Sequence, residues 1–245
     1  MAPWMEYSMR DAMFFFCLTS HSISGIWAIC PEVTVTREIF NEGFHRDLVS
    51  RVKFIGLSEH VDNCKVMFQE KVPSGLYVDP YQLSSLQEHN ITEAIITDMV
   101  DVEAPEYLST EHAAYIFAKP DLLTCAKCFR ADIPVHFRYH QPSLEDGEAS
   151  VTLQGPQLLI RCSPGRTLEE CWEYSKVDAP CAANDGIICR WNNIKYRAVP
   201  EELTLHVPVG LHQHSSVICA LTLLVTLSCS VMILVAVYGR AGLHI

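Results

Sequence analysis

The sequence predicts an all-β body, an antiparallel sandwich or jelly-roll-like fold, followed by one C-terminal transmembrane α-helix. Two observations predict this class. Apolar and polar residues alternate in several short runs between turn residues, and one long apolar run without charge or proline lies near the C-terminus. Alternation with period two is typical of half-buried strands, because successive side chains of a strand point to opposite faces.

The alternation is clearest at residues 133–139 and 203–209, where every second residue is apolar. Further strands are expected at residues 33–39, 48–55, 65–72, 94–102, 113–118 and 149–160. Turn signals occur between or within these runs at residues 73–75, 145–147 and 155–156. One short helix is expected at residues 80–89, and the cysteine-dense stretch 162–189 is expected to be loop-rich.

The apolar run at residues 217–238 reads VICALTLLVTLSCSVMILVAVY. A helix of this length is about 33 Å long, which suffices to cross a hydrocarbon core of about 30 Å. A buried helix of a soluble protein would normally carry a polar face. We therefore expect a transmembrane helix at residues 217–238.

The N-terminus predicts the topology. The apolar run AMFFFCL at residues 12–18 precedes small and polar residues, which is typical of a secretory signal, here expected to be residues 1–28. A soluble N-terminal helix is the alternative. With a signal, residues 29–216 form a lumenal domain, and residues 239–245 form a short cytoplasmic tail whose Arg240 agrees with the positive-inside rule. The last strand ends so near the span that the body should lie close to the bilayer surface.

Charge and motifs argue against several functions. The chain carries 18 Lys and Arg against 29 Asp and Glu, a net charge of −11, so nucleic acid is a poor partner. No phosphate-binding loop, nucleophile elbow or dinucleotide fingerprint is present. Asp98, Asp101 and Glu103 are similar to acidic motifs that hold a metal in sugar transferases, but in a strand they would point to opposite faces. We therefore expect no catalytic residue, cofactor or metal site.

The cysteines indicate an oxidising compartment, because disulfides form in secretory proteins. Of the 11 cysteines, Cys17 lies in the expected signal, Cys219 and Cys229 lie in the span, and Cys30 lies beside the cleavage site. The remaining cysteines are disulfide candidates whose pairing the sequence leaves open: Cys64, Cys125, Cys128, Cys162, Cys171, Cys181 and Cys189.

Cys125 and Cys128 form a CxxC motif with two other interpretations. A redox pair would need a helix N-terminus that lowers a thiol pKa, and a zinc site would need further ligands such as His136 or His140. The CxxC motif lies between two expected strands, and His136 and His140 lie on or next to one of them. This placement favours structural disulfides.

Asn90-Ile91-Thr92 is the one Asn-x-Ser/Thr sequon, and we expect Asn90 to be glycosylated.

Small residues form a stripe along the expected membrane helix. At about 100° per residue they fall within an arc of roughly 100°, while Ser228 lies on the opposite side. Small residues permit close contact between helices in lipid, so the stripe predicts a face that docks on another transmembrane helix. Alternatively, its hydroxyls bond only to their own helix. The stripe consists of Cys219, Thr222, Thr226, Cys229 and Ser230.

Several segments resemble one known family. They read QEKVPSGLYVDPYQLSSLQEHNIT (69–92), DVEAPEYLST (101–110), PVHFRYHQP (134–142), DGEASV (146–151) and HVPVGL (206–211), and the likeness covers roughly residues 40–238. The chain is thereby identified as a member of the phosphatidylinositol-glycan biosynthesis class X family.

The resemblance implies a noncatalytic subunit of a mannosyltransferase of the endoplasmic reticulum. This enzyme adds the first mannose to glucosaminyl-phosphatidylinositol. The resemblance further implies that a separate multi-span chain is catalytic and that the present chain stabilises it. Two alternatives remain from the residues: a single-pass cell-surface receptor or adhesion protein, and an oxidoreductase-like chaperone using Cys125 and Cys128. A cleaved lipid-anchor signal at the C-terminus is disfavoured, because the polar spacer is missing.

Overall fold

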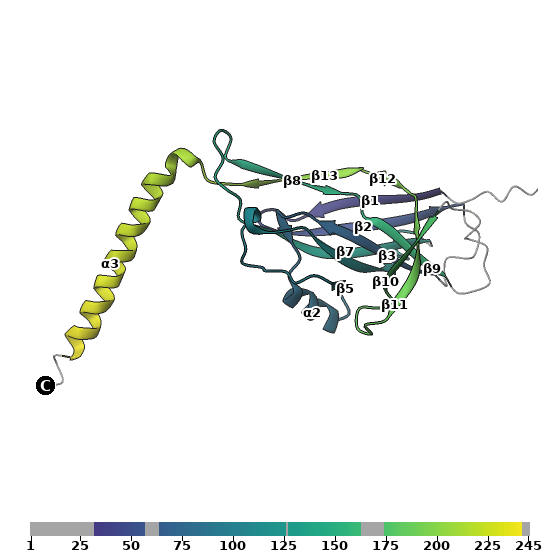
Figure 1. The fold of residues 1–245 in the computed structure, drawn as a ribbon, viewed down its shortest axis with the longest axis horizontal. Helices are drawn as coiled ribbons and strands as arrows, with labels where there is room; N and C mark the ends of the chain where they lie inside the picture. The colour runs from purple at the N-terminus through teal and green to yellow at the C-terminus, as the bar shows by residue number, and fades with distance from the viewer. Residues whose placement is uncertain (1–31, 57–63, 126, 163–173, 242–245) are drawn as a thin grey trace, which may run out of the picture. The chain divides into compact units, whose positions relative to one another are not determined.

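The computed structural model describes residues 32–56, 64–125, 127–162 and 174–241. The expected signal at residues 1–28 lies outside them. The described chain is a β-rich body followed by one long helix (Figure 1). Its elements are β1 (Glu32–Phe40), β2 (His45–Ile55), β3 (Cys64–Val72), β4 (Leu76–Tyr77), α2 (Pro80–Glu88), β5 (Glu93–Ile96), η1 (Glu106–Leu108), β6 (His112–Pro120), β7 (Cys128–Phe137), β8 (Glu148–Gln154), β9 (Gln157–Cys162), β10 (Tyr174–Pro180), β11 (Ile188–Ile194), β12 (Arg197–Val199), β13 (Glu202–Pro208), η3 (His212–His214) and α3 (Ser215–Ala241).

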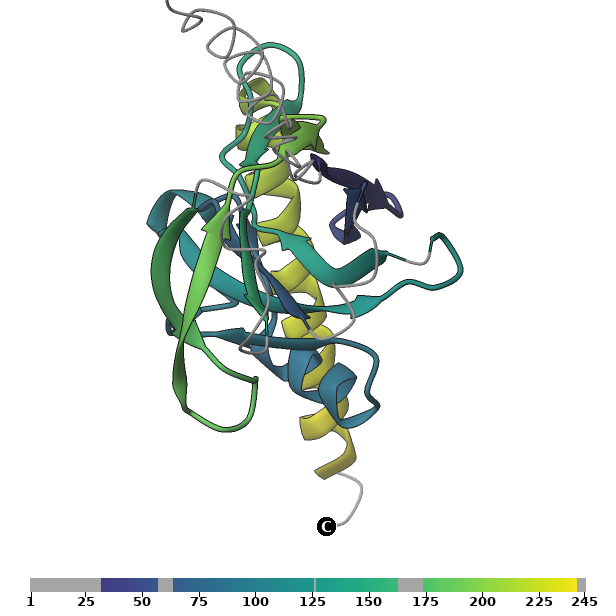
Figure 2. The ribbon, with the colours of Figure 1, turned by 90° about the vertical axis from the view of Figure 1, so that its right-hand side faces the viewer.

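Eleven strands form one curled sheet in the order β10-β11-β9-β3-β6-β7-β2-β1-β12, with β4 beside β7 and β5 beside β6. β1 and β12 run parallel, and the other paired strands of the described residues run antiparallel. β6 pairs with β7 over only two residues, Lys119 with Arg130 and Pro120 with Phe129. The sheet bends at this short junction, and its curl is visible end-on in Figure 2.

The bend brings both halves of the sheet around one core. Val35 of β1, Phe68 of β3 and Ile133 of β7 belong to the same buried cluster. A separate two-stranded sheet of β8 and β13 contributes Val151 and Val207 to that cluster. The expectation of an all-β body followed by one apolar helix is therefore confirmed.

The strand predictions failed in three places. β5 ends at Ile96, so the predicted strand 94–102 is mostly a loop, and the predicted strand 149–160 divides into β8 and β9 at Gly155-Pro156. The stretch expected to be loop-rich contains β10 and the start of β11. β11 continues to Trp191, which is fully buried in a second cluster with Met67 and Leu159. Pairing with β9 overrides the polar composition of β11, because strand stability depends strongly on packing against neighbours.

A charged pair lies inside the main core. Arg37 of β1 donates from Nη2 to Glu70 Oε2 of β3 at 2.8 Å, and both side chains are at most 2% exposed. Arg37 Nη1 also donates to the Gln154 carbonyl of β8 at 2.7 Å. The pair therefore connects β1, β3 and β8 through the interior. Burial raises the pKa of Glu70 to about 7, and the neighbouring Arg37 opposes this rise.

This raised pKa predicts a pH dependence of stability. The folded protein holds the Glu70 proton more tightly than the unfolded chain, so this contribution is fully present below about pH 4.5 and is lost as the pH rises through about 7. Between these values we expect a loss of up to about 1.4 kcal/mol per pH unit. Glu70→Gln should flatten the dependence of the unfolding midpoint on pH, whereas Glu145→Gln on the surface should leave it unchanged. An equal slope in both variants would contradict this role of Glu70.

Candidate partner-binding site on the membrane helix

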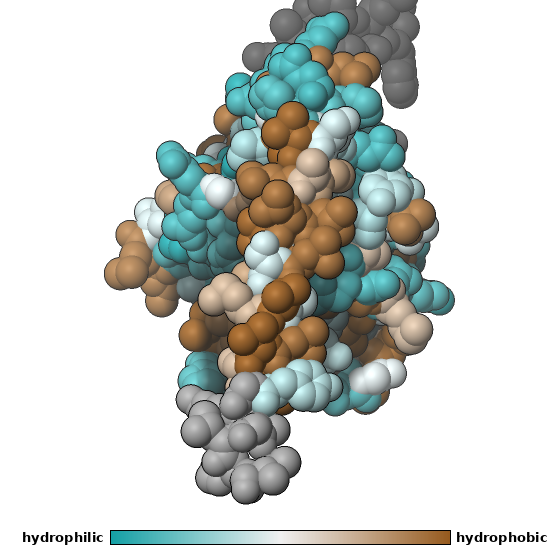
Figure 3. All heavy atoms as spheres, turned by 90° about the vertical axis from the view of Figure 1, so that its left-hand side faces the viewer, coloured by the Kyte–Doolittle hydropathy of each residue, from teal (hydrophilic) through white to brown (hydrophobic). Residues whose placement is uncertain are grey.

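α3 has the length and composition of a membrane span. The segment His212–Tyr238 is the one helix among the described residues that is long and apolar enough, and none of it is buried in the protein. Figure 3 shows α3 as a hydrophobic band interrupted by a few paler residues. The side chains of residues 217–238 are all exposed, so the β body does not cover them.

The hydroxyls of α3 bond along the helix. Thr226 Oγ1 donates to the Thr222 carbonyl at 2.9 Å, and Ser230 Oγ donates to the Thr226 carbonyl at 2.8 Å. Ser228 on the opposite side does the same with Leu224 at 2.8 Å. Two hydroxyls of the stripe, those of Thr226 and Ser230, thus bond to their own helix, and the docking face stays a prediction.

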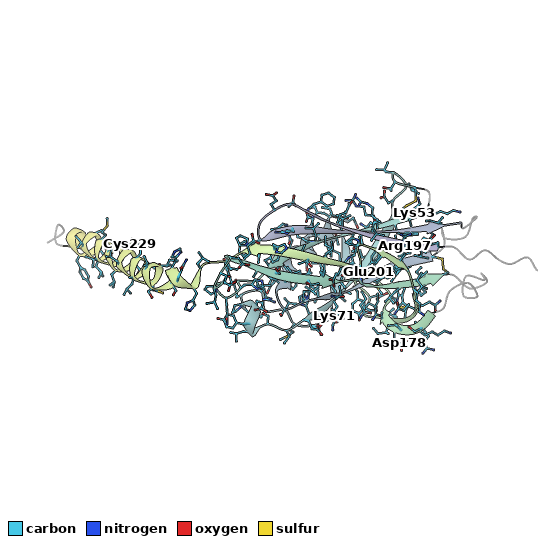
Figure 4. The ribbon with its side chains drawn as sticks, turned by 90° about the horizontal axis from the view of Figure 1, so that it is seen from above. Lys53, Lys71, Asp178, Arg197, Glu201 and Cys229 are labelled. Atoms are coloured by element: carbon cyan, nitrogen blue, oxygen red, sulfur yellow. A yellow bond between two sulfur atoms is a disulfide. The ribbon has the colours of Figure 1, made fainter. Side chains whose placement is uncertain are left out.

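Because of these bonds, docking of α3 on another helix would depend mainly on close packing and less on hydrogen bonds between the helices. The Thr226 and Ser230 hydroxyls already donate within α3, so they can only accept from a second helix, while the small volume of the stripe permits close packing of that helix. Cys219 and Cys229 of the same stripe are free and exposed, and Figure 4 shows Cys229 on the surface of α3. The stripe is thus a candidate van der Waals contact face.

Two of the acidic residues considered for a metal site, Asp98 and Asp101, form hydrogen bonds with backbone amides. Since β5 ends at Ile96, Asp98, Asp101 and Glu103 lie in a loop and not on a strand as predicted. Asp98 Oδ2 accepts from the Ala113 amide at 3.0 Å, and Asp101 Oδ1 accepts from the Glu103 amide at 3.0 Å. Within the described residues no three His, Cys, Asp or Glu side chains are placed to hold a metal ion.

A polar cavity of about 290 Å³ lies beside this loop, lined by Asp98, Asp101, His112 and Arg138 among others. Arg138 is buried and donates from Nη1 to the Asp101 and Ala104 carbonyls at 2.5 and 2.7 Å. Burial and the neighbouring Arg138 lower the pKa of His112. These contacts fix the loop, and the arrangement shows no nucleophile paired with a base.

Three disulfides join six of the candidate cysteines. They are Cys64–Cys162, Cys125–Cys128 and Cys181–Cys189. Cys64 and Cys162 are direct register partners on β3 and β9, which places their side chains together. Cys171, the remaining candidate, lies outside the described residues.

The CxxC motif runs from Cys125 in the β6–β7 connection to Cys128, the first residue of β7, and does not lie at a helix N-terminus. Its thiols therefore lack the helix dipole that lowers the pKa of redox cysteines. His136, considered as a zinc partner, is within 2.8 Å of Gln82 Oε1 and stacks on Tyr77. The geometry favours a structural disulfide.

Asn90 is placed for glycosylation on the surface after α2, where it is exposed with a φ of 55°. Thr92 is 5% exposed, and its hydroxyl donates to the Asp132 carbonyl at 2.9 Å. Because this hydroxyl is enclosed, we expect the glycan to be added before the body folds.

Asn90→Gln should remove a single endoglycosidase-H-sensitive band shift from the full chain, because no other sequon is present. Gln87→Asn, a conservative change nearby that creates no sequon, should keep the shift. An unshifted wild-type chain would contradict the modification of Asn90.

The fold and the helix together define a class: a β-rich, disulfide-bonded body carried by one helix of membrane-spanning length. Comparison with known families identifies which member of this class it resembles. The model of the PIG-X / PBN1 family matches residues 41–238, and the chain belongs to this family. The family predicted from the sequence segments is confirmed.

Curated relatives agree. A human protein described as "GPI alpha-1,4-mannosyltransferase I, stabilizing subunit" is 46% identical over 91% of this chain and 88% of the relative. A rat protein of the same description is 43% identical over 89% and 88%, and a mouse protein is 42% identical over 89% and 87%.

Proposed function

We propose that this chain is the noncatalytic stabilising subunit of the mannosyltransferase that adds the first mannose to glucosaminyl-phosphatidylinositol during glycosylphosphatidylinositol-anchor synthesis. Membership of the PIG-X / PBN1 family, with relatives described as the stabilising subunit, carries this proposal. The exposed apolar helix α3 supports it, because its small-residue face is suited to contact with another membrane chain. The family favours this function over a cell-surface receptor.

The proposed location is the endoplasmic reticulum membrane, in a single-pass type I topology. Residues 1–28 are the signal, residues 29–216 lie in the lumen, residues 217–238 span the bilayer, and residues 239–245 face the cytoplasm. The disulfides and the exposed Asn90 support a lumenal body, since both belong to the secretory compartment.

The proposed partner is a multi-span catalytic chain, because reaction on a membrane lipid needs a site enclosed by several helices. In the proposed mechanism, the small-residue stripe of α3 packs on one helix of that partner. An uncovered helix face would expose the catalytic chain to degradation. Coverage of that face by α3 would therefore lengthen the lifetime of the catalytic chain.

Replacing Thr222, Thr226 and Ser230 together with leucine should lower recovery of the catalytic chain with this subunit severalfold. The added side chains would push the two helices apart, and close approach provides much of the association energy in lipid. Co-purification from mild detergent measures this effect. Ser228→Leu is the matched control, because it removes a hydroxyl with the same intrahelical bond from the opposite side. Equal recovery of the triple variant and wild type would exclude the stripe as the contact face.

The function itself is tested in microsomes from cells that lack this chain. Supplied with a labelled mannose donor, they should accumulate unmannosylated glucosaminyl-phosphatidylinositol, and re-expression of the chain should restore mannose transfer. Normal mannolipid formation without the chain would contradict the proposed function.

A further inference from the structure

We infer that the end of the β body nearest α3 carries an apolar rim that inserts into the headgroup region of a zwitterionic phospholipid bilayer. The rim is a set of exposed side chains on three separate turns of the body. It consists of Phe44, Tyr107, Leu108, Tyr139 and Leu144. The inference rests on the proposed membrane span, but it does not depend on the mannosyltransferase assignment.

Contacts between the turns bring the rim residues together. Phe44, after β1, lies with its ring centroid 5.9 Å from that of Tyr139, after β7. The Tyr139 carbonyl accepts from the Glu106 amide at 3.0 Å, and Glu106 begins the 3-10 turn that carries Tyr107 and Leu108. The rim is thus one surface, although its members are far apart in the sequence.

The rim is also tied to the start of the membrane helix. The Ser143 amide donates to the Gly210 carbonyl, and the His212 amide donates to the Ser143 carbonyl, both at 2.9 Å. Arg46 at the start of β2 donates from Nη2 to the His206 carbonyl of β13 at 2.8 Å and from Nε to the Gly43 carbonyl of the preceding turn at 3.1 Å. In Figure 1 the arrowheads of β1 and β13 point toward this same end of the body.

The length of the connecting chain limits how far the rim can lie from the bilayer. Val217 follows His212 by five positions. The intervening residues are helical, so they span only about 8 Å at a rise of 1.5 Å per residue. The headgroup region is roughly 5 to 7 Å thick on each side of the hydrocarbon core. Ser143 and the neighbouring Leu144 must therefore lie at or near the headgroups, whatever the direction of α3.

The side chains suit this environment. Leu144 and Tyr139 are 82% and 77% exposed, and Leu108 is 71% exposed. Removing such apolar side chains from water is favourable, and Tyr is enriched at membrane interfaces. Several exposed apolar side chains gathered at one end of a body favour an interaction there more than single scattered ones do. The chain length places a lipid surface within its reach.

Charge around the rim selects the lipid type. Glu42, Glu145 and Asp146 are exposed on the same turns. These carboxylates would repel a surface of anionic lipids, since like charges at close range are unfavourable. The rim is therefore suited to phosphatidylcholine-like headgroups, which carry no net charge.

The test places a benzoyl-phenylalanine photo-crosslinker at Tyr139 or at Leu144 in the full chain, in microsomes whose phosphatidylcholine carries a clickable choline. Leu123 is the matched control, because it is a fully exposed leucine in the β6–β7 connection, away from these turns. Val225 within α3 is the positive control for the span.

We expect lipid adducts at Tyr139 and Leu144 severalfold above those at Leu123. Adducts to a second protein at the rim would show that the catalytic partner covers it and would overturn the inference. Lipid adducts no stronger than at Leu123 would also overturn it. A lack of lipid adducts at Val225 would overturn the span and the rim together, whereas adducts at Val225 alone would reject only the rim. Both rim positions are exposed, and wild-type membrane levels of each variant verify folding.

Discussion

Arg37→Leu is expected to lower the free energy of unfolding by about 3–5 kcal/mol, because it removes one partner of a buried pair and leaves the Glu70 carboxyl group without its hydrogen-bond donor. For a body of this size this corresponds to roughly 10 °C in the unfolding midpoint. Tryptophan fluorescence of the detergent-solubilised full chain can follow the transition, since Trp191 is fully buried in the body.

Arg51→Leu provides the matched control. Arg51 forms an ion pair of 2.6 Å with Glu38, but the two side chains are 23% and 54% exposed, so its loss should cost less than about 1 kcal/mol. Replacing Arg37 and Glu70 together with leucine should recover part of the loss, because no unpaired polar group remains in the core. A double variant no more stable than Arg37→Leu would contradict the explanation by an unpaired polar group.

Replacing Cys64 and Cys162 together with serine should cost roughly 2–5 kcal/mol and sharply reduce the amount of folded chain in cells. This disulfide joins residues 98 positions apart, and it ties β3 to β9 in the middle of the curled sheet. In the chain-entropy model a closed loop of about 100 residues contributes about 4.7 kcal/mol. The measurement is the unfolding midpoint together with the membrane level of the variant.

Replacing Cys125 and Cys128 is the comparison that isolates loop length. Their separation is 3, so the same model assigns this disulfide only about 2 kcal/mol. Equal losses in the two pairs of variants would contradict the loop-length argument. A Cys125 and Cys128 variant that folds normally but no longer maintains the catalytic partner would instead support the oxidoreductase-like alternative.

Part of the fold could be predicted because local pattern and burial coincide. In β7 the alternating residues Ile133, Val135 and Phe137 are all buried, and β13 behaves in the same way at Leu205 and Val207. Tyr139 continues the alternation but lies beyond the end of β7, where it is exposed and joins the rim. The pattern predicts which residues share a face, but it cannot locate the residue at which a strand leaves the sheet.

The alternation within β1 and β3 places the two residues of the buried ion pair at inward positions. Arg37 occupies the inward position of the series Val33, Val35 and Arg37, and Glu70 follows Val66 and Phe68 in the same way. Two opposite charges at inward positions of predicted strands indicate a buried pair. Their partnership depends on the curl of the sheet, which local sequence does not specify.

The rim could not be predicted, because its residues come from turns that only the tertiary contacts bring together. Phe44, Leu108 and Tyr139 are each ordinary when considered alone, since single exposed apolar residues are common on protein surfaces. The small-residue stripe is the opposite case. Helical periodicity places its members on one face, so the sequence sufficed to define it.

The lifetime of the catalytic mannosyltransferase chain tests the central claim most directly. It can be measured by pulse-chase in cells lacking this subunit, with and without its re-expression. We expect a markedly shortened lifetime that the wild-type chain restores and that the Thr222, Thr226 and Ser230 leucine variant restores only in part. An unchanged lifetime in the absence of this chain would contradict a stabilising role.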